Sequence, residues 1–161
     1  DIKFLLVGDG KLKPSLESRA LSERLDNILF HEPVNKIKLA GLMCATDLGL
    51  QTLANIPAFY YGTSPNKFFD YISAGLPVLN NYPGWLSDMI SENNCGFCVP
   101  PENASAFADA LEKAANDRPA LTIKGVNAKT LAVENFDRKI QSSKWVDAVE
   151  LSFKKWKKTK L

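Results

Sequence analysis

The stretch GTSPNKFFDYISAGLPVL, residues 62–79, contains the signals that decide the fold. Ser64 and Pro65 indicate the start of a helix, because serine is a favoured N-cap and proline is favoured at the first helical position. Gly75 is typical of the residue that ends a helix in the left-handed conformation. The apolar run at 76–80 then predicts a buried strand. A helix therefore leads almost directly into a strand.

Strands and helices alternate in the same way on both sides of this stretch. Short apolar runs predict strands at 2–7, 27–34 as far as Pro33, 47–52, 76–80 and 96–100. Apolar residues at helical spacing predict helices at 11–25, 35–45, 65–74, 85–92, 103–116, 119–134 and 137–156. This alternation implies βαβ units and a parallel sheet covered on both faces. We expect a doubly wound α/β domain, whose ligands bind beyond the carboxyl ends of the strands.

Length and composition fit one domain. The chain has 161 residues, 45% hydrophobic and 24% charged, as is usual for a soluble globular protein. We expect a sheet core over 1–115 and additional helices over 116–161. Because the chain begins inside an apolar run, we interpret it as a piece of a longer protein. The sequence shows no membrane span or signal peptide, and its three cysteines favour a reducing compartment, so we expect a cytoplasmic location.

The start of the helix at 65–74 is more positive than folding requires. The N–H groups of Asn66 and Lys67 are expected to point out of the helix end, where the macrodipole is positive. Lys67 adds a full charge at this unfavourable place, which favours an anion-binding site. A plain surface lysine on a well-capped helix is the alternative. One turn further on, Asp70 suits the vicinal hydroxyl groups of a ribose, unless it simply pairs with Lys67.

Three other features give weaker signals. Gly8, in the turn VGDG at 7–10, would let a ligand approach the backbone closely, although a plain turn also explains it. The pair Cys95 and Cys98 is followed by prolines, so no helix can begin there to activate a thiol, and a structural role is favoured. His31 is the single histidine, and we interpret it as a structural or ligand-edge residue. The sequence contains no metal-ligand motif.

The last predicted helix carries an apolar stripe beside a basic end. Trp145, Val149, Phe153 and Trp156 fall on one helical face, and residues 151–161 contain five lysines and no acidic residue. The rest of the chain is mildly acidic, which argues against a nucleic-acid-binding surface. This helix could pack on its own domain, dock on a missing partner domain, or rest on an anionic membrane surface.

The motifs VGDG, NILFHEPV, TDLGL, SPNKFFDYISAGLPVL and GFCVPPENASAFADAL follow one another in the order and spacing of a known family. They resemble the C-terminal, nucleotide-sugar-binding domain of retaining GT-B glycosyltransferases of group 1, over about residues 2–115. The most specific element runs from Asp70 to Val78, an acidic residue followed by Tyr-x-x-Ala-Gly-x-Pro-Val. Subgroups that build bacterial surface polysaccharides have Ser-Pro-Asn-Lys before it, as at 64–67.

The resemblance implies where the diphosphate and the ribose of the donor would lie. The family binds the diphosphate on backbone amides that fall on Ser64, Asn66 and Lys67, and Lys67 is the residue to which we assign a catalytic role. The family's ribose-binding glutamate falls on Asp70.

The resemblance also implies contacts with the donor's sugar and base. The glutamate that contacts the donor sugar in the family falls on Gly62, so Thr63 or Ser64 would have to supply this contact. The base-binding strand end of the family reaches Pro33 and Val34. The basic residues that usually neutralise the diphosphate, and the N-terminal acceptor domain, would lie upstream of residue 1.

Membership of this family would imply a hexosyl-type glycosyltransferase that uses a UDP- or GDP-linked sugar without a metal or other cofactor. Its acceptor would be a glycan or a lipid-linked molecule, and the Lys- and Trp-rich C-terminal segment would contact the inner face of the membrane. The fragment alone is expected to bind nucleotide weakly and to be inactive. Two alternatives stay open: a GT-B-shaped sugar-nucleotide epimerase, and a non-catalytic α/β interaction module.

Overall fold

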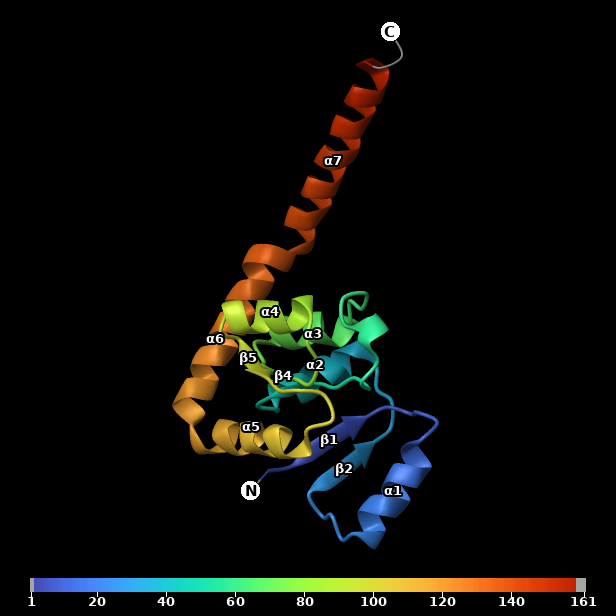
Figure 1. The fold of residues 1–161 in the computed structure, drawn as a ribbon, viewed down its shortest axis with the longest axis vertical. Coiled ribbons are helices and arrows are strands. Elements are labelled where there is room, and N and C mark those ends of the chain that lie inside the picture. Colours follow the sequence, from blue (N-terminus) through green and yellow to red (C-terminus); the bar gives the residue numbers. More distant parts are fainter. Residues whose placement is uncertain (1, 159–161) are drawn as a thin grey trace.

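The computed structural model describes residues 2–158 and is an α/β fold (Figure 1). The strands are β1 (Phe4–Val7), β2 (Ile28–His31), β3 (Gly49–Gln51), β4 (Val78–Asn80) and β5 (Gly96–Cys98). The helices are α1 (Lys13–Ser22), α2 (Lys36–Cys44), α3 (Asn66–Ala74), α4 (Trp85–Glu92), α5 (Ala104–Asn116), α6 (Arg118–Phe136) and α7 (Arg138–Lys158), with a short 3-10 helix, η1, at Pro57–Phe59. Every predicted element is present, with ends that differ by a few residues.

The strands form two parallel sheets. In one sheet β1 pairs with β2, so that Val7 lies opposite His31; in the other, β4 lies between β3 and β5. The α/β class with parallel strands is confirmed, but the sequence led us to expect one continuous sheet. Within residues 2–158, no strand is hydrogen-bonded between β1 and β3, so each of these two strands keeps an unpaired edge.

The core surrounds the three-stranded sheet. β4 is buried along its whole length. Helices α3, α4 and α6 supply the buried side chains around it, including Phe68, Ile72, Leu86, Ile90, Ala128 and Leu131. The first third of the chain is much less buried, because Leu12 is 66% exposed, Leu21 83% and Ile37 84%. The β1–α1–β2 part therefore leaves apolar surface that a parallel sheet normally covers.

Helix α3 is fixed against α6 by a close approach of two backbones. Gly75 ends α3 with φ +76°, the left-handed conformation predicted for it. A Cβ atom on Gly125, in the middle of α6, would lie 2.6 Å from the Gly75 carbonyl oxygen. Only glycine therefore lets α6 pass this close to the end of α3.

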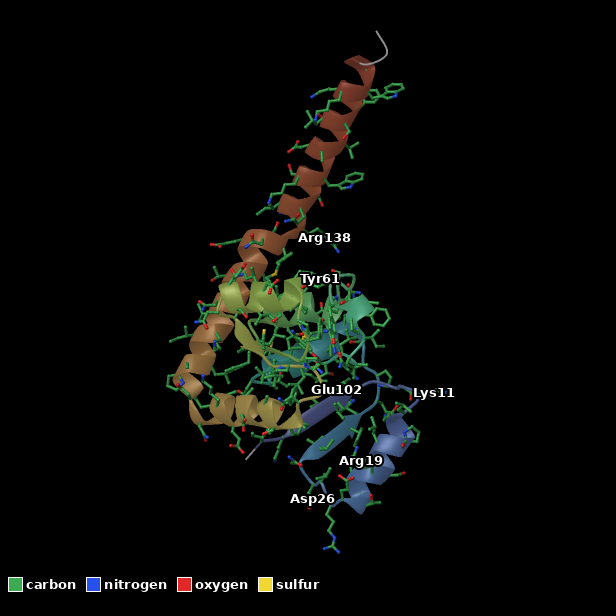
Figure 2. All side chains as sticks on the ribbon, in the orientation of Figure 1. Lys11, Arg19, Asp26, Tyr61, Glu102 and Arg138 are labelled. Carbon is green, nitrogen blue, oxygen red and sulfur yellow. The ribbon has the colours of Figure 1, made fainter. Side chains whose placement is uncertain are left out.

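Helix α7 extends away from the body as a separate arm that starts at Arg138 (Figures 1 and 2). The carboxylate of Asp137 begins this helix by accepting a hydrogen bond from the Lys139 N–H at 2.9 Å. The apolar stripe stays in solvent, with Trp145 70% exposed and Phe153 53%. The stripe therefore does not pack on the body of the described chain.

We predict opposite effects of alanine at two helical glycines. Gly125→Ala should lower the free energy of unfolding by about 1–3 kcal/mol, because the new methyl group overlaps the Gly75 carbonyl. Gly41→Ala in α2 is the matched control: its Cβ would meet nothing within 4 Å, so stability should rise by about 0.4–1 kcal/mol. Urea unfolding measures both values. Equal effects of the two substitutions would contradict the close approach.

Candidate functional site

The N-terminus of α3 lies at the carboxyl edge of the three-stranded sheet. The chain leaves the carboxyl end of β3, forms a loop over 52–65, runs back through α3 and enters β4. We call residues 62–67 the α3 entrance. In a parallel α/β sheet this is the edge where ligands bind. Helix α3 begins at Asn66, with Pro65 as its N-cap residue and no side-chain capping bond. The prediction that the Ser64 side chain caps this helix is therefore wrong.

At the α3 entrance the backbone N–H groups of Ser64, Asn66 and Lys67 have no acceptor among the described residues, and neither has that of Gly62. Within helix α3, the first N–H that is bonded is that of Phe68, which donates to the Pro65 carbonyl at 3.0 Å. Unpaired N–H groups together with the positive end of the macrodipole make a helix N-terminus attractive to anions. The predicted donors are therefore all free.

Lys67 brings a further positive charge to these donors. Its side chain is partly buried, and desolvation lowers the pKa of its amine below the usual 10.5. No ion pair or hydrogen bond of Lys67 is found within residues 2–158, although Asp70 follows one turn later and is exposed. The alternative, an ion pair between Lys67 and Asp70, is therefore not present in the structure. Lys67 is thus a cation without a counter-ion, and Asp70 remains available.

The two candidates for contact with the donor sugar differ: Gly62 is exposed, whereas the polar groups of Thr63 are already hydrogen-bonded within the chain. Gly62 is exposed, and a Cβ there would come only to ordinary contact distance of the Ala58 carbonyl. The Thr63 hydroxyl and N–H both donate to the Phe59 carbonyl, at 2.7 and 3.2 Å, and its carbonyl accepts from the Trp85 indole N–H at 2.9 Å. Thr63 therefore has no proton left to donate to a ligand. Ser64, which is exposed, keeps both its hydroxyl and its N–H.

The remaining candidates lie at the carboxyl ends of β1 and β2. The Gly8 N–H donates to the His31 carbonyl at 3.1 Å, so the structure brings these two residues together. Pro33 is exposed and Val34 partly buried, while Glu32 forms an ion pair with Lys13. No hydrogen bond or ion pair of the described chain joins this group to the α3 entrance.

The cysteines agree with a structural role. Cys95 is fully buried, and burial raises the pKa of its thiol to about 11, the opposite of what a reactive thiol needs. Cys98 is exposed, and its sulfur lies 3.5 Å from the Ser87 carbonyl oxygen. Among residues 2–158 no group of three or more His, Cys, Asp or Glu side chains is placed to hold a metal ion.

Sequence reasoning missed a set of residues beneath the α3 entrance. Gln51 and Asn80 are buried at the carboxyl ends of β3 and β4, and the Gln51 amide donates to the Tyr82 hydroxyl at 3.1 Å. Burial raises the pKa of Tyr82, and hydrogen bonding with Gln51 and Thr63 opposes that rise. Polar residues directly after apolar strands, as in GLQ and VLN, were the available signal.

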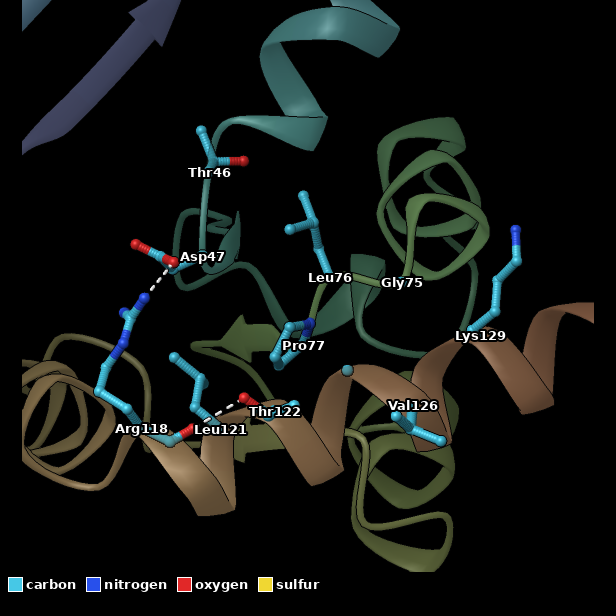
Figure 3. A pocket seen from close by; sticks show the side chains of 11 residues that line it. Thr46, Asp47, Gly75, Leu76, Pro77, Arg118, Leu121, Thr122, Val126 and Lys129 are labelled. Atoms are coloured by element: carbon cyan, nitrogen blue, oxygen red, sulfur yellow. Dashed lines mark hydrogen bonds and ion pairs between the residues drawn. The ribbon is translucent and has the colours of Figure 1, made fainter.

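A cavity of about 380 Å³ opens at the other edge of the sheet (Figure 3). It is lined by Asp47 and Pro77, which precede β3 and β4, and an ion pair between Asp47 and Arg118 lies beside it. Because these are the amino ends of the strands, the cavity is separate from the α3 entrance.

Comparison with known proteins identifies the family. The family model for glycosyl transferases group 1 matches residues 1–117. The chain belongs to this family. A search of curated proteins gave no match.

Solved structures of this glycosyltransferase fold agree over most of the chain. The sucrose-phosphate synthase of Thermosynechococcus elongatus matches with a TM-score of 0.76 and 20% identity, over 92% of this chain and 38% of its own. HepE of Anabaena, solved in complex with UDP-glucose, matches with a TM-score of 0.72 and 19% identity, over 92% and 40%. WaaG, a glycosyltransferase involved in lipopolysaccharide biosynthesis, has 26% identity and a TM-score of 0.61, over 83% and 34%.

The fold is thus the Rossmann-like half of the GT-B architecture. The chain spans about two fifths of the length of the sucrose-phosphate synthase and HepE chains. Among the described residues, no helix combines the length and the apolar character that crossing a bilayer requires.

We predict that removing the charge of Lys67 stabilises the fold. Lys67→Met should raise the free energy of unfolding at pH 7 by about 0.3–1 kcal/mol, because a cation at a helix N-terminus is unfavourable. The lowered pKa means that the folded chain binds fewer protons than the unfolded chain as pH rises towards 10.5. The free energy of unfolding of the wild type should therefore rise over this range. Lys67→Met should lack the part of this rise that comes from deprotonation of Lys67. Urea unfolding from pH 7 to 10.5 measures both effects.

Lys129 provides the matched control for this prediction. Its amine donates to the Ser73 carbonyl at 2.6 Å, at the C-terminal end of the same helix, where a cation is favourable. Lys129→Met should therefore destabilise the chain by a similar amount. If both substitutions destabilise the fold equally, the electrostatic description of α3 is wrong.

Proposed function

We propose that this chain is the donor-binding half of a retaining, hexosyl-type glycosyltransferase. It would bind a UDP- or GDP-linked sugar for transfer to a glycan or lipid-linked acceptor in surface polysaccharide synthesis. One observation carries the proposal. In a member of the group 1 family, Lys67 and the backbone N–H groups of Ser64, Asn66 and Lys67 lie together at the positive end of α3, and none of them has a partner among the described residues. The complex of HepE with UDP-glucose and the role of WaaG in lipopolysaccharide biosynthesis support the choice of donor and pathway class.

Each part of the donor has a proposed contact. The diphosphate lies against the N–H groups of Ser64, Asn66 and Lys67 and the Lys67 amine, and the ribose hydroxyls donate to Asp70. When the bond to the sugar breaks, negative charge develops on the departing diphosphate, and Lys67 with the helix end stabilises it electrostatically. The partial desolvation of Lys67 strengthens this effect, because fewer water dipoles compete with the phosphate.

Base and sugar recognition are assigned to other residues. The nucleotide base is assigned to the carboxyl ends of β1 and β2, where it would contact Gly8, Pro33 and Val34. Gly62 leaves room beside the sugar, and Ser64 supplies the hydroxyl contact, since the Thr63 hydroxyl already donates to Phe59.

The proposed enzyme needs parts outside this chain. The unpaired edges of β1 and β3 suit one further parallel strand between them, and the exposed leucines of the β1–α1–β2 part suit a covering helix. We propose that an N-terminal region supplies both, together with basic residues for the diphosphate and the acceptor domain. The chain alone is then expected to bind nucleotide without transferring sugar.

We also propose a cytoplasmic location with peripheral contact at the inner face of the membrane. The apolar stripe of α7 is exposed beside Lys154, Lys155 and Lys157, an arrangement that suits an anionic bilayer surface.

A second candidate function is a sugar-nucleotide epimerase of the same architecture, since it would use the same diphosphate contacts. Assay of the full-length protein with a sugar nucleotide and a glycan acceptor separates the two, because only a transferase needs the acceptor. A non-catalytic interaction module would bind neither substrate.

We predict different losses of affinity for two substitutions at the site. Lys67→Met should weaken UDP or GDP binding roughly 10–100-fold, the value of a charge-assisted hydrogen bond, and should leave nucleoside binding unchanged. Asp70→Asn should weaken the binding of the nucleoside diphosphate and of the nucleoside by the same factor, because both ligands carry the ribose. Calorimetry gives the affinities, and amide shifts should be confined to residues 31–34 and 62–70.

Lys129→Met, at the opposite end of α3, should bind nucleotide like the wild type. A folded wild-type chain that binds neither UDP nor GDP at millimolar concentration would contradict the proposed donor site.

We predict that the chain binds vesicles containing phosphatidylglycerol and not vesicles of phosphatidylcholine alone. Replacing Lys154, Lys155 and Lys157 with glutamine should reduce partitioning roughly 100-fold, at about 1 kcal/mol for each lysine. Vesicle co-sedimentation measures the effect. The same change at Lys11, Lys36 and Lys38 removes equal charge elsewhere and should have little effect. Equal binding to both vesicle types would contradict the membrane contact.

A further inference from the structure

Trp85, the first residue of α4, joins three elements at the α3 entrance. Its indole N–H donates to the Thr63 carbonyl at 2.9 Å. Its ring meets the ring of Phe68 edge-on, with centroids 6.5 Å apart and planes at 84°. Phe68 is fully buried on α3. Trp85 therefore connects α4 both with the loop before α3 and with α3 itself.

The hydrogen bond from Trp85 fixes the direction of the Ser64 N–H. The Thr63 carbonyl and the Ser64 N–H belong to one peptide unit, which is planar and trans, so the two groups point in opposite directions. With the carbonyl directed at the indole, the N–H is directed away from it. This N–H is among those at the α3 entrance that have no acceptor in the described chain. The orientation of one free donor is thus set by a side chain from another helix.

The other groups of Thr63 prevent this peptide from turning. Its hydroxyl and its N–H both donate to the Phe59 carbonyl. Gly62, the residue before it, carries no side chain that could hold the loop. The position of the peptide therefore depends on bonds made by Thr63 itself, and Trp85 supplies the one that acts on its carbonyl.

The segment that carries Trp85 is itself bound to the loop. The Asn81 side chain exchanges two hydrogen bonds with the backbone of Leu53, at 2.8 and 3.0 Å, and the Tyr82 ring stacks on Tyr60 at 6.1 Å. Gly84 has φ +115°, and a Cβ there would lie 2.3 Å from the Tyr60 carbonyl oxygen. Residues 81–85 therefore contact the 52–65 loop at Leu53, Tyr60 and Thr63, and Trp85 makes the contact nearest to the start of α3.

We propose that Trp85 is a positioning residue of the donor site. Its hydrogen bond to Thr63 holds the peptide whose N–H, on Ser64, binds the diphosphate. This inference rests on the proposed function, because it needs a diphosphate at the α3 entrance. Trp85 does not touch the donor itself. Its effect should therefore appear on the phosphate part of the ligand and not on the nucleoside.

The test replaces the indole N–H while keeping the ring. Trp85→Phe removes the donor, and site-specific incorporation of 3-benzothienylalanine at position 85 puts sulfur in place of the N–H with almost no change of shape. Binding is measured for the tighter of UDP and GDP, for its monophosphate and for its nucleoside. We expect both variants to lose roughly five- to tenfold in diphosphate affinity, with nucleoside affinity unchanged. The Ser64 amide shift should also move in the free protein.

Two controls make the outcome decisive. Trp145→Phe on the exposed arm of α7 should bind all three ligands like the wild type. If the wild type binds the diphosphate and both Trp85 variants bind it equally well, the positioning role is wrong while the donor site stands. If the variants lose affinity for all three ligands alike, Trp85 is only structural. If the wild type binds no nucleotide, the proposed function and this inference both fail.

Discussion

The structure depends on two close backbone approaches that hold α3 and the loop before it. At the C-terminal end, α6 passes over the Gly75 carbonyl at Gly125. Before the N-terminal end, the Tyr60 carbonyl lies directly on Gly84. A nine-residue helix would be marginal by itself, so its position comes from these tertiary contacts. These two contacts hold α3 and the loop before it in position, so the positive end of the helix dipole lies at the carboxyl edge of the sheet.

This fixed helix explains why an unfavourable charge can persist at its start. Lys67 lies at the positive end and has no counter-ion among the described residues, whereas the Lys129 amine donates to the Ser73 carbonyl at the negative end. One lysine therefore stabilises α3 and the other opposes it. The packing of Phe68 and Ile72 in the core offsets the unfavourable term, since both are fully buried. Local rules of helix formation are most often broken at functional sites, and this break coincides with N–H groups at the α3 entrance that have no acceptor among the described residues.

Local chemistry decided what could be predicted from the sequence. The order of strands and helices, the left-handed Gly75 and the free donors at Asn66 and Lys67 follow from spacing and from the properties of single residues. The failed prediction of a Ser64 cap shows the limit: Pro65 takes the N-cap position, and the Thr63 carbonyl is held from outside the helix. The bond from Trp85 spans 22 positions, and no local pattern in the sequence announces it. Likewise, the division into two sheets depends on long-range strand pairing.

The division of the sheet also divides the candidate donor site. The proposed phosphate and ribose contacts lie on α3, which packs into the buried core around the three-stranded sheet. The candidates on the base side, Gly8, Pro33 and Val34, belong to β1 and β2, whose sheet is not hydrogen-bonded to the other within residues 2–158. The free energy of nucleotide binding to this chain should then come mainly from the diphosphate and the ribose. Discrimination between bases requires that the two sheets be held at a fixed distance, and a strand between β1 and β3 would do this. We therefore propose that base specificity depends on the completed sheet, whereas α3 alone supplies the proposed phosphate contacts.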